Sequence, residues 1–440
     1  MLIEFKAGNF RSLCEPAVLS MVASHLTARN KGLDRDNVVP VHDELALLKT
    51  AAIYGPNAGG KSNLVRALRF MRDFVLESSR ETQAGDLIPV EPFLLREDMI
   101  SVPSSFEIVF ELKGVQYRYG FELDAQHVHA EWLFSRQSTR ERTLFERVFQ
   151  DVTLGPGFRK EGKGLDERTR PNALFLSVAA QWNGSLSTEL IRWFQQFQIL
   201  IGDHSRNQET LAQLQAEGPE KTAIDRLVKS LDLGIEQIFV VETQQDAVEA
   251  NESSEARTSF RRMGRPPTVP VYSIGTLHRR LTVDGEIKDY MLFDLERHES
   301  DGTQRLFALA GVILGALRRG DLLVVDELDM RLHPLMTCEL IRLFHDRETN
   351  PHNAQLVFTT HDTNLLGIDL FRRDQVWFAE KDRMGATHLY SLAEFKVRSD
   401  ASFEKDYVRG KFGAIPFLGG LRSVVDEAIK TGEADEAADG

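Results

Sequence analysis

A short segment near the start of the chain has the residue types and spacing of a phosphate-binding loop. Residues 55–62, GPNAGGKS, match the pattern G-x-x-x-x-G-K-[ST] at every fixed position. Glycines let the backbone wrap around an anion, so that amide N–H groups and a helix N-terminus face the phosphates. We expect Lys61 to contact the β- and γ-phosphates of ATP and Ser62 to hold Mg²⁺. The predicted nucleotide-binding residues of this loop are Gly55, Asn57, Gly59, Gly60, Lys61, Ser62 and Asn63.

Two adjacent carboxylates end an apolar segment in the second half of the chain. Residues 320–325, GDLLVV, are followed by Asp326 and Glu327. At the carboxyl end of a buried parallel strand, Asp326 would hold the hydrated Mg²⁺. Glu327 would then orient and deprotonate the attacking water. An apolar run followed by two carboxylates is common by chance, so this prediction depends on its pairing with the phosphate loop.

A histidine follows a third apolar segment, 355–360, with the sequence QLVFTT. A neutral imidazole at this strand end can hydrogen-bond to the γ-phosphate. A lone histidine is usually structural. In a chain with a phosphate loop, we favour a catalytic role for His361, together with Lys61 and Glu327.

A second anion site is predicted where residues 299–305, ESDGTQR, precede the apolar helix 306–317. Ser300 and Gly302 at a helix N-terminus would offer N–H groups and a favourable dipole to a phosphate. An ordinary N-cap is the alternative interpretation. If the two anion sites lie on separate lobes, the simplest way to use both on one nucleotide is a head-to-tail dimer that encloses two ATP molecules.

An arginine follows the first predicted strand, 2–5, in the sequence NFRS. Arg11 in this turn is a candidate contact to the base or phosphates of the nucleotide. The alternative is a strand-end turn with Phe10 in the core, and the sequence leaves both open.

The elements that must position these residues are predicted from apolar periodicity. Strand 45–54, the phosphate loop and helix 63–77 come in the required order. Residues 104–123 alternate around Lys113-Gly114, which predicts a β-hairpin that continues to residue 134 in an antiparallel sheet. The fold class is therefore α/β, a P-loop NTPase with an antiparallel β subdomain and a helical insertion lobe.

The middle of the chain is more polar. Residues 155–170 predict a mobile loop, 171–235 a helical lobe, and 243–270 an exposed segment with the composition of disordered chain. Four arginines in the last segment are candidates for nucleic-acid phosphates, although nearby glutamates favour a solvated loop: Arg257, Arg261, Arg262 and Arg265. The predicted domains are 1–150 and 271–430 as two parts of the ATPase core, 151–270 as the helical insertion lobe and 431–440 as an acidic tail.

Composition favours a cytoplasmic protein without a membrane partner. The 440 residues carry a formal net charge of −13, so the whole chain is not a polycation. The two cysteines, Cys14 and Cys338, have no metal-ligand spacing and suggest no disulfide framework. The N-terminal residues lack the pattern of a secretory signal, and the longest apolar run, 306–317, is too short to span a bilayer.

With these motifs in order, the chain resembles the ABC-type ATPase heads of the SMC, RecF and OLD superfamily. The segments GPNAGGKSN and NFRS are similar to that group rather than to transporters. More narrowly, it resembles stand-alone ATPases of abortive-infection and phage-defence operons, including AbiL-like and RloA-like proteins. The segments that carry this resemblance are FLSVAAQ (175–181), ESDGTQRL, DELDMRLHP, TTHDTNLL and YVRGKFGAIP (407–416).

The resemblance implies roles for several positions. Ser300 and Gly302 would be the signature that completes the ATP site of a second copy, Leu328-Asp329 the D-loop and His361 the switch histidine. The signature departs from the transporter pattern, since SDGTQ replaces LSGGQ. The Q-loop glutamine is not identified, and Gln83 and Gln116 are candidates by position only.

The resemblance also implies a homodimer or higher homo-oligomer that works as an ATP-driven switch. No clustered acidic motif of a TOPRIM nuclease and no HNH-like cluster follows His361, so we expect a separately encoded effector, a nuclease or toxin. The alternative is a RecF- or SMC-like repair or recombination ATPase that clamps DNA directly, which keeps nucleic acid among the candidate partners. A transporter motor is the third possibility, but the sequence gives no sign of a membrane partner.

Overall fold

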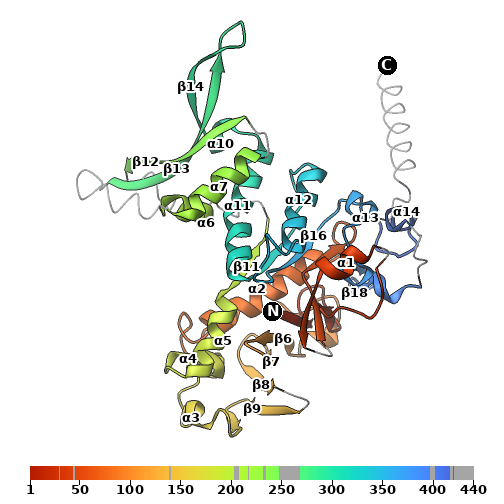
Figure 1. Ribbon diagram of the computed structural model, residues 1–440. Coiled ribbons are helices and arrows are strands. Elements are labelled where there is room, and N and C mark those ends of the chain that lie inside the picture. The colour runs from red at the N-terminus through yellow and green to blue at the C-terminus, as the bar shows by residue number, and fades with distance from the viewer. Residues whose placement is uncertain are drawn as a thin grey trace, which may run out of the picture.

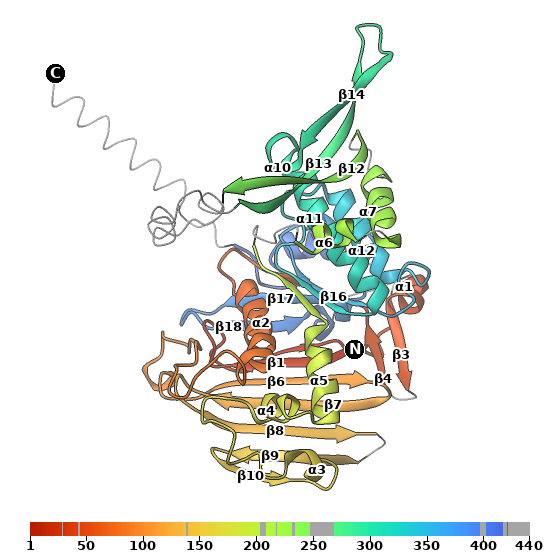
Figure 2. The same cartoon turned by 90° about the vertical axis from the view of Figure 1, so that its left-hand side faces the viewer.

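One helix lies between two β-sheets, and this arrangement positions the predicted site. The computed structural model describes residues 1–420 apart from 29, 43–44, 138–139, 203–207, 217, 231–233, 247–267, 397–401 and 417–419. Helix α2 (Lys61–Glu77) contributes Leu64, Leu68 and Met71 to a core that also contains residues of both sheets (Figure 2). The phosphate loop therefore begins a helix that is packed on both sides.

The first sheet is mostly parallel and runs in the order β11-β15-β16-β5-β17-β18, with only β18 antiparallel to its neighbour. Its strands are β11 (Phe197–Leu200), β15 (Leu322–Val325), β16 (Gln355–Thr359), β5 (Thr50–Tyr54), β17 (Val376–Lys381) and β18 (Thr387–Ser391). Strands β5, β15 and β16 are buried throughout, as expected for parallel strands covered on both faces.

The second sheet has seven strands in the order β10-β9-β8-β7-β6-β1-β2. They are β1 (Leu2–Gly8), β2 (Ala17–Ser20), β6 (Ser104–Leu112), β7 (Val115–Leu123), β8 (Val128–Arg136), β9 (Glu141–Val148) and β10 (Asp151–Leu154). The predicted hairpin is confirmed as β6 and β7, with positive φ at both loop residues, Lys113 (53°) and Gly114 (80°). Rings on α2 pack against this sheet, for example Phe74 on Phe121 with centroids 5.6 Å apart.

Helices cover the other face of the parallel sheet. They are α11 (Asp301–Arg319), α12 (Pro334–His345), α13 (Asn364–Gly367) and α14 (Phe403–Val408), with the short 3-10 helices η2 (Arg373–Gln375) and η3 (Leu392–Glu394) nearby. The apolar helix predicted at 306–317 is thus confirmed inside α11. The closing segment 407–416 packs here too, since Tyr407 stacks on Phe378 and its hydroxyl donates to the Ala414 carbonyl at 2.8 Å.

A separate three-stranded sheet projects from the body of the protein at the top of Figure 1. It consists of β12 (Ile235–Asp246), β13 (Thr268–Leu281) and β14 (Ile287–Asp294), with the β13–β14 hairpin at its tip. Helices α6 (Gln208–Gln215) and α7 (Pro219–Ser230) join it in a small core that includes Phe307 of α11. The short helix α10 (Leu295–His298) leads from β14 directly to α11.

The structure corrects the prediction of a single helical lobe at 151–270. Helices α4 (Phe175–Gln181) and α5 (Ser185–Gln195) belong to the core around α2, whereas α6 and α7 pack with the three-stranded sheet. Between them, β11 pairs with β15 inside the parallel sheet, and β10 at the start of the range extends the antiparallel one. The range is therefore divided among three regions. Residues 431–440 lie outside the described part of the chain.

The predicted mobile loop at 155–170 is also corrected, because it contains a short helix and several buried residues. It contains helix α3 (Arg159–Gly162), and Phe158 is fully buried against Phe145 and Phe175. One buried aromatic residue fixes a segment whose composition is otherwise that of a loop. Of the segment predicted to be exposed at 243–270, residues 247–267 with the four arginines lie outside the described residues, and the rest extends β12 and β13.

The predicted strand 45–54 is two strands that separate at Lys49. Strand β4 (Leu45–Leu48) pairs with β3 (Val38–His42) in a small ladder, and β5 enters the parallel sheet. Helix α1 (Lys31–Asp36) precedes β3, and the 3-10 helix η1 (Glu97–Met99) precedes β6. None of the described helices combines the length and apolar composition needed to cross a bilayer.

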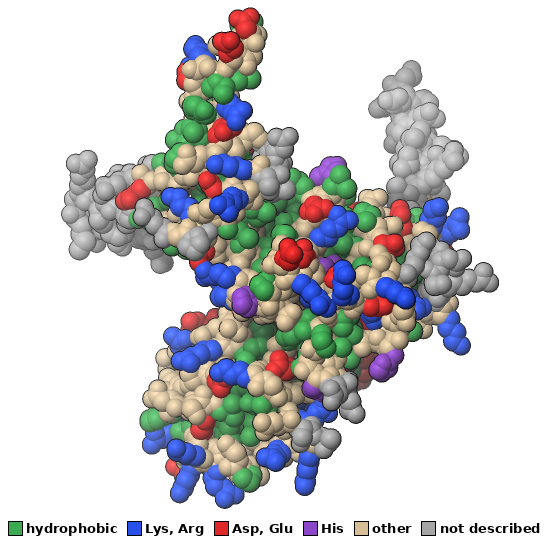
Figure 3. All heavy atoms as spheres, in the orientation of Figure 1, with side chains coloured by type: hydrophobic (Ala, Val, Ile, Leu, Met, Phe, Trp, Pro, Cys, Tyr) green, Lys and Arg blue, Asp and Glu red, His purple; other side chains and the backbone are tan. Residues whose placement is uncertain are grey.

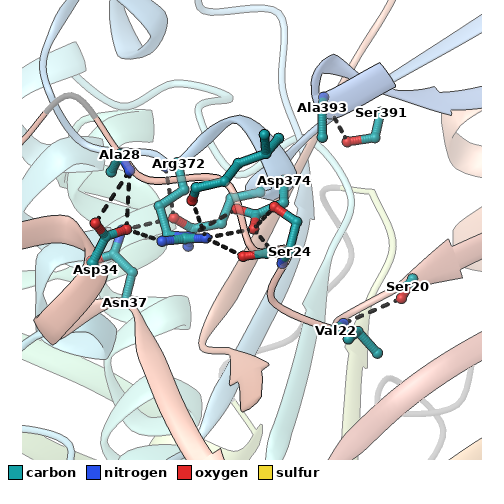
Figure 4. A network of polar contacts seen from close by, with 12 residues as sticks. Ser20, Val22, Ser24, Ala28, Asp34, Asn37, Arg372, Asp374, Ser391 and Ala393 are labelled. Carbon is teal, nitrogen blue, oxygen red and sulfur yellow. Dashed lines mark hydrogen bonds and ion pairs between the residues drawn. The ribbon is translucent and has the colours of Figure 1, made fainter. Parts of the chain in front are cut away.

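A polar network lies at the amino end of β17 and fastens the early chain to the late chain (Figure 4). The buried guanidinium of Arg372 contacts the carboxylates of Asp374 and Asp34 and donates to the Ser24 carbonyl at 3.0 Å. Next to it, Asn37 donates to Oε1 of Gln375 at 2.8 Å. This network ties residues 24–37 to the parallel sheet.

Candidate functional site

The phosphate loop has the backbone geometry of an anion site. It connects the end of β5 to α2, whose N-cap is Gly60 at φ 103° with no side-chain cap. The first N–H groups of a helix have no intrahelical partners, and the helix dipole adds positive potential there. A phosphate fits this end of α2, where no side chain occupies the cap position.

Neighbouring strands explain why the loop needs glycine. A Cβ atom on Gly55 would overlap the Ala379 carbonyl of β17, and one on Gly60 would overlap the side chain of Thr387 on β18. Thr387 Oγ1 also donates to the Gly59 carbonyl at 3.2 Å and lies at hydrogen-bond distance, 2.8 Å, from Ser12 Oγ. Strands β17 and β18 therefore support the loop from behind and keep its curved shape.

The lysine of the loop is buried and directed back over it. Nζ of Lys61 donates to the carbonyls of Gly55 at 2.7 Å and Pro56 at 3.1 Å. Burial lowers the pKa of Lys61 to about 8, while the nearby carboxylates of Glu327 and Asp326 act in the opposite direction. An anion beside Nζ would favour the charged form, so the site is electrostatically suited to phosphate.

A pocket of about 370 Å³ joins the loop to the other predicted residues. Its lining brings together the phosphate loop, the predicted general base and the predicted switch histidine. The lining residues are Pro56, Asn57, Ala58, Gly59, Gly60, Lys61, Ser62, Asn63, Arg66, Glu327, His361 and Lys381. The sequence motifs separated by about 270 residues or more thus converge, as parallel strands require at their carboxyl ends.

The two carboxylates follow β15 as predicted, and they are held by β16. Asp326 is buried, and its Oδ1 accepts from Thr359 Oγ1 at 2.7 Å. The Glu327 N–H donates to the same hydroxyl at 2.7 Å, and Glu327 has φ 54° in the left-handed region. The Asp326 N–H donates to the Leu200 carbonyl at 2.8 Å, which fixes the end of β11 beside the carboxylates.

His361 lies at the mouth of the pocket, directly after β16. Its backbone N–H donates to Asp329 Oδ2 at 3.3 Å, which links the predicted switch residue to the predicted D-loop. Partial desolvation, and after it the charge of Lys61, lowers the pKa of His361. The imidazole is therefore neutral near pH 7 and available as a hydrogen-bonding group.

The predicted N-terminus at Ser300 is confirmed, but it does not face the pocket of its own chain. Ser300 is the N-cap of α11, exposed, with Oγ accepting from the Thr303 N–H at 3.2 Å. A Cβ atom on Gly302 would come within 2.8 Å of the Arg331 carbonyl, so this position requires glycine. Neither residue lines the pocket around Lys61.

The residue before Ser300 is tied to the three-stranded sheet. Glu299 Oε1 lies 2.6 Å from His278 Nε2 and also accepts from the Thr276 hydroxyl, both on β13. The end of α11 that carries Ser300 is thus connected to β13 by side chains as well as to β14 by the chain.

Arg11 lies away from the phosphate loop. It forms an ion pair with Glu91 at 2.6 Å and lines a different cavity, of about 490 Å³, along α2. Arg66 borders both cavities, so Arg11 is a neighbour of the site rather than part of the phosphate pocket. Phe10 is buried against Phe106, with centroids 5.4 Å apart, as the strand-end interpretation predicts.

Several site residues were missed from the sequence. Arg66 and Lys381 line the pocket, Thr359 holds both carboxylates, and Thr387 supports the loop. The position of Arg66, one helical turn after Ser62 on α2, was a usable signal, whereas the threonines lie on strands without any local motif. Gln116 is on the antiparallel sheet and bonded to Arg136, and neither it nor Gln83 lines the pocket.

The comparisons with known proteins agree with this geometry. No curated protein matches the chain. Residues 51–367, well over half of the chain, match the family described as "AAA domain, putative AbiEii toxin, Type IV TA system". The match spans the phosphate loop, the carboxylates after β15 and His361. The chain therefore belongs to this family, with a nucleotide-binding AAA domain of the abortive-infection and SMC, RecF and OLD type.

Proposed function

We propose that the protein binds and hydrolyses Mg·ATP and closes head-to-tail on a second copy, and that this cycle controls a separately encoded nuclease or toxin in bacterial anti-phage defence. The observation that carries the proposal is the separation of two anion-binding helix ends. Lys61 lines the pocket at the start of α2, whereas Ser300 and Gly302 at the start of α11 are outside it.

The pocket has the groups needed to bind a triphosphate. The amide N–H groups of the loop and Lys61 bind the phosphates, and Arg66 and Lys381 add positive charge at the rim. Ser62 and Asp326 are the residues that would hold Mg²⁺, which when bound neutralises charge on the phosphate oxygens. Both kinds of ligand atom, hydroxyl and carboxylate oxygen, suit a hard cation.

Glu327 is the proposed general base. It lines the same pocket as Lys61, so its carboxylate can accept a proton from a water that attacks the γ-phosphate. His361, neutral near pH 7, is positioned to donate or accept a hydrogen bond at the same phosphate. Lys61 stabilises the negative charge that the phosphate oxygens retain during transfer.

The second copy would supply Ser300 and Gly302. Ser300 is exposed, so the N-terminus of α11 is accessible to the nucleotide of a partner. ATP would then have higher affinity for the closed dimer than for the open chain, and this difference is what lets a ligand shift an assembly equilibrium.

The test uses a variant that keeps ATP bound. We expect Glu327→Gln to form a dimer with Mg·ATP, measured by sedimentation velocity, and to remain monomeric with ADP. The matched control is Glu327→Gln combined with Ser300→Arg, which keeps the phosphate loop and blocks the start of α11. Equal sedimentation of both proteins with ATP would rule out the head-to-tail arrangement.

The proposed effector and defence role rest on the family, whose description names a toxin–antitoxin system. The proposed cytoplasmic location rests on the two cysteines, which have no disulfide framework. A toxin held inactive by this ATPase would bind one nucleotide state better than the other. Co-purification of the adjacent gene product with Glu327→Gln in ATP and in ADP measures that difference. Equal recovery in both states would contradict nucleotide control of an effector.

Direct clamping of nucleic acid is the second candidate function. Figure 3 shows many Lys and Arg side chains on the lower part of the molecule, where Figure 1 places β9 and α3. Exposed basic residues there, such as Arg142, Arg159 and Lys160, have exposed acidic neighbours such as Glu141 and Glu146. A DNA-stimulated ATPase activity that falls steeply with salt would favour this second function.

A further inference from the structure

Thr359, the last residue of β16, makes hydrogen bonds to three consecutive residues of the predicted catalytic segment. Its Oγ1 donates to Asp326 Oδ1 and accepts from the Glu327 N–H, both at 2.7 Å. Its carbonyl accepts from the Leu328 N–H at 3.1 Å. Thr359 is fully buried, so water does not compete for these bonds.

These bonds hold a backbone that the sheet itself no longer fixes. The parallel ladder between β15 and β16 ends at the pair Val325 and Phe358. Beyond it, Glu327 adopts φ 54°, which for a residue with a Cβ costs about 1–2 kcal/mol relative to the ordinary helical region. A conformation of this kind persists when its surroundings determine it, and the Thr359 hydroxyl is one of those surroundings.

The hydroxyl also sets the direction of the Asp326 carboxylate. A threonine hydroxyl has one proton, and the carboxylate Oδ1 receives it, so the N–H of Glu327 must be met by an oxygen lone pair. With Oδ1 engaged by Thr359, Oδ2 is the carboxylate oxygen of Asp326 that would hold the metal. One side chain thereby fixes both a metal-binding group and the backbone of the general base.

We propose that Thr359 is a positioning residue for ATP hydrolysis, through its hydroxyl contacts to Asp326 and Glu327. The inference rests on the proposed ATPase function. Contacts to a metal ligand from its surroundings typically contribute about 10–100-fold to metal affinity or activity. We expect an effect of that size when the hydroxyl is lost.

The test compares Thr359→Val, which keeps the branched shape, with Thr359→Ser, which keeps the hydroxyl. The matched control is Thr50→Val at the opposite end of the sheet. Thr50 is equally buried, and its hydroxyl also has two partners, Gln375 Nε2 at 2.6 Å and His345 Nε2 at 2.8 Å. Both valine variants remove a buried hydroxyl from the same sheet, so their effects on thermal unfolding should be similar.

Two readouts separate positioning from stability. We expect Thr359→Val to lower kcat for ATP about 10–100-fold, with little change in KM, and Thr359→Ser to restore most of it. In the presence of a non-hydrolysable ATP analogue, Mn²⁺ affinity measured by electron paramagnetic resonance should fall for Thr359→Val and stay unchanged for Thr50→Val.

Equal kcat and equal Mn²⁺ affinity in the two valine variants would overturn the proposal, as would a Thr359→Ser variant as impaired as Thr359→Val. If the wild-type protein shows no ATP turnover, the proposed function fails. The Mn²⁺ affinities would still decide whether Thr359 positions Asp326.

Discussion

The two ends of the parallel sheet both contain buried polar residues, but they use them differently. At the carboxyl end, Lys61 and Glu327 line a pocket, and Asp326 is buried beside Glu327. At the amino end, Lys49 donates to the His345 carbonyl at 2.7 Å, and Gln375 bonds to Thr50. The polar side chains at the amino end contact one another and nearby carbonyls, whereas those at the carboxyl end line a space large enough for phosphates.

The comparison shows that a shifted pKa does not by itself mark a functional site. Burial lowers the pKa of Lys49 to about 8, the same value to which it lowers that of Lys61. What differs is the surroundings: Lys61 lines the pocket beside the open end of α2, and Lys49 lies under the sheet near His345. If the amino end serves stability and the carboxyl end serves chemistry, substitutions at the two ends should change different properties of the protein.

The largest effect is expected for Glu327→Gln. Loss of the general base should reduce ATP hydrolysis about 10²–10⁴-fold and leave nucleotide binding intact. Steady-state phosphate release and equilibrium binding of ATP measure the two quantities. The control is Glu339→Gln on α12, where the glutamate is exposed and pairs with Arg342. If Glu327→Gln hydrolysed ATP at the wild-type rate, the carboxyl end of the sheet would not have the proposed catalytic role.

The next effect is on stability at the amino end. Arg372→Ala should lower the free energy of unfolding by about 3–5 kcal/mol, because it leaves the buried carboxylate of Asp374 without its ion-pair partner. Urea unfolding measures this, and turnover per folded molecule should stay unchanged. Arg342→Ala, at an exposed pair, is the control, with an expected loss below about 1 kcal/mol. A change in kcat without a change in stability would contradict the division between the two ends.

A smaller effect is expected on the stability of the folded chain at acidic pH. Burial lowers the pKa of His345 to about 3, from an ordinary value of 6.5. The unfolded chain then binds a proton that the folded chain does not, so stability falls as pH decreases from about 6.5 toward 3. The titration of His345 changes the free energy of unfolding by up to about 1.4 kcal/mol per pH unit. Urea unfolding of His345→Gln between pH 7 and 5 should show a shallower pH dependence than wild type, and equal slopes would refute the assignment.

The smallest effect is expected at alkaline pH in the pocket. With a pKa of about 8, Lys61 loses its charge as pH rises above that value, and the affinity for an anionic nucleotide should fall by up to about tenfold per pH unit. The free energy of unfolding should change in the opposite direction and rise with pH. Between pH 8 and the ordinary lysine pKa, the unfolded chain binds more protons than the folded chain. Isothermal titration with ATP from pH 7 to 9 tests the first statement, with Lys61→Arg as the variant that should lose the pH dependence.

Much of the phosphate site could be predicted because its signal is local. The loop 55–62, the carboxylates after β15 and His361 each follow an apolar strand, and parallel strands bring such ends together. The supporting residues could not be predicted in this way. Thr359 and Thr387 act on segments distant in the sequence, and nothing in their own neighbourhood distinguishes them from other strand threonines.

The errors in the fold have similar causes. Strand β11 has four residues between helices and loop, too few for a periodic pattern, so the chain around it was assigned to a helical lobe. The segment 155–170 was predicted to be mobile from its glycines and charges, but the burial of Phe158 against two other phenylalanine rings decides its structure. In both cases a tertiary contact overrides local composition.

The attachment of Glu299 to β13 connects the long β13–β14 hairpin to the start of α11. Because Glu299 bonds to Thr276 and His278 at the base of this hairpin, a displacement of the hairpin base would also displace the helix end that carries Ser300.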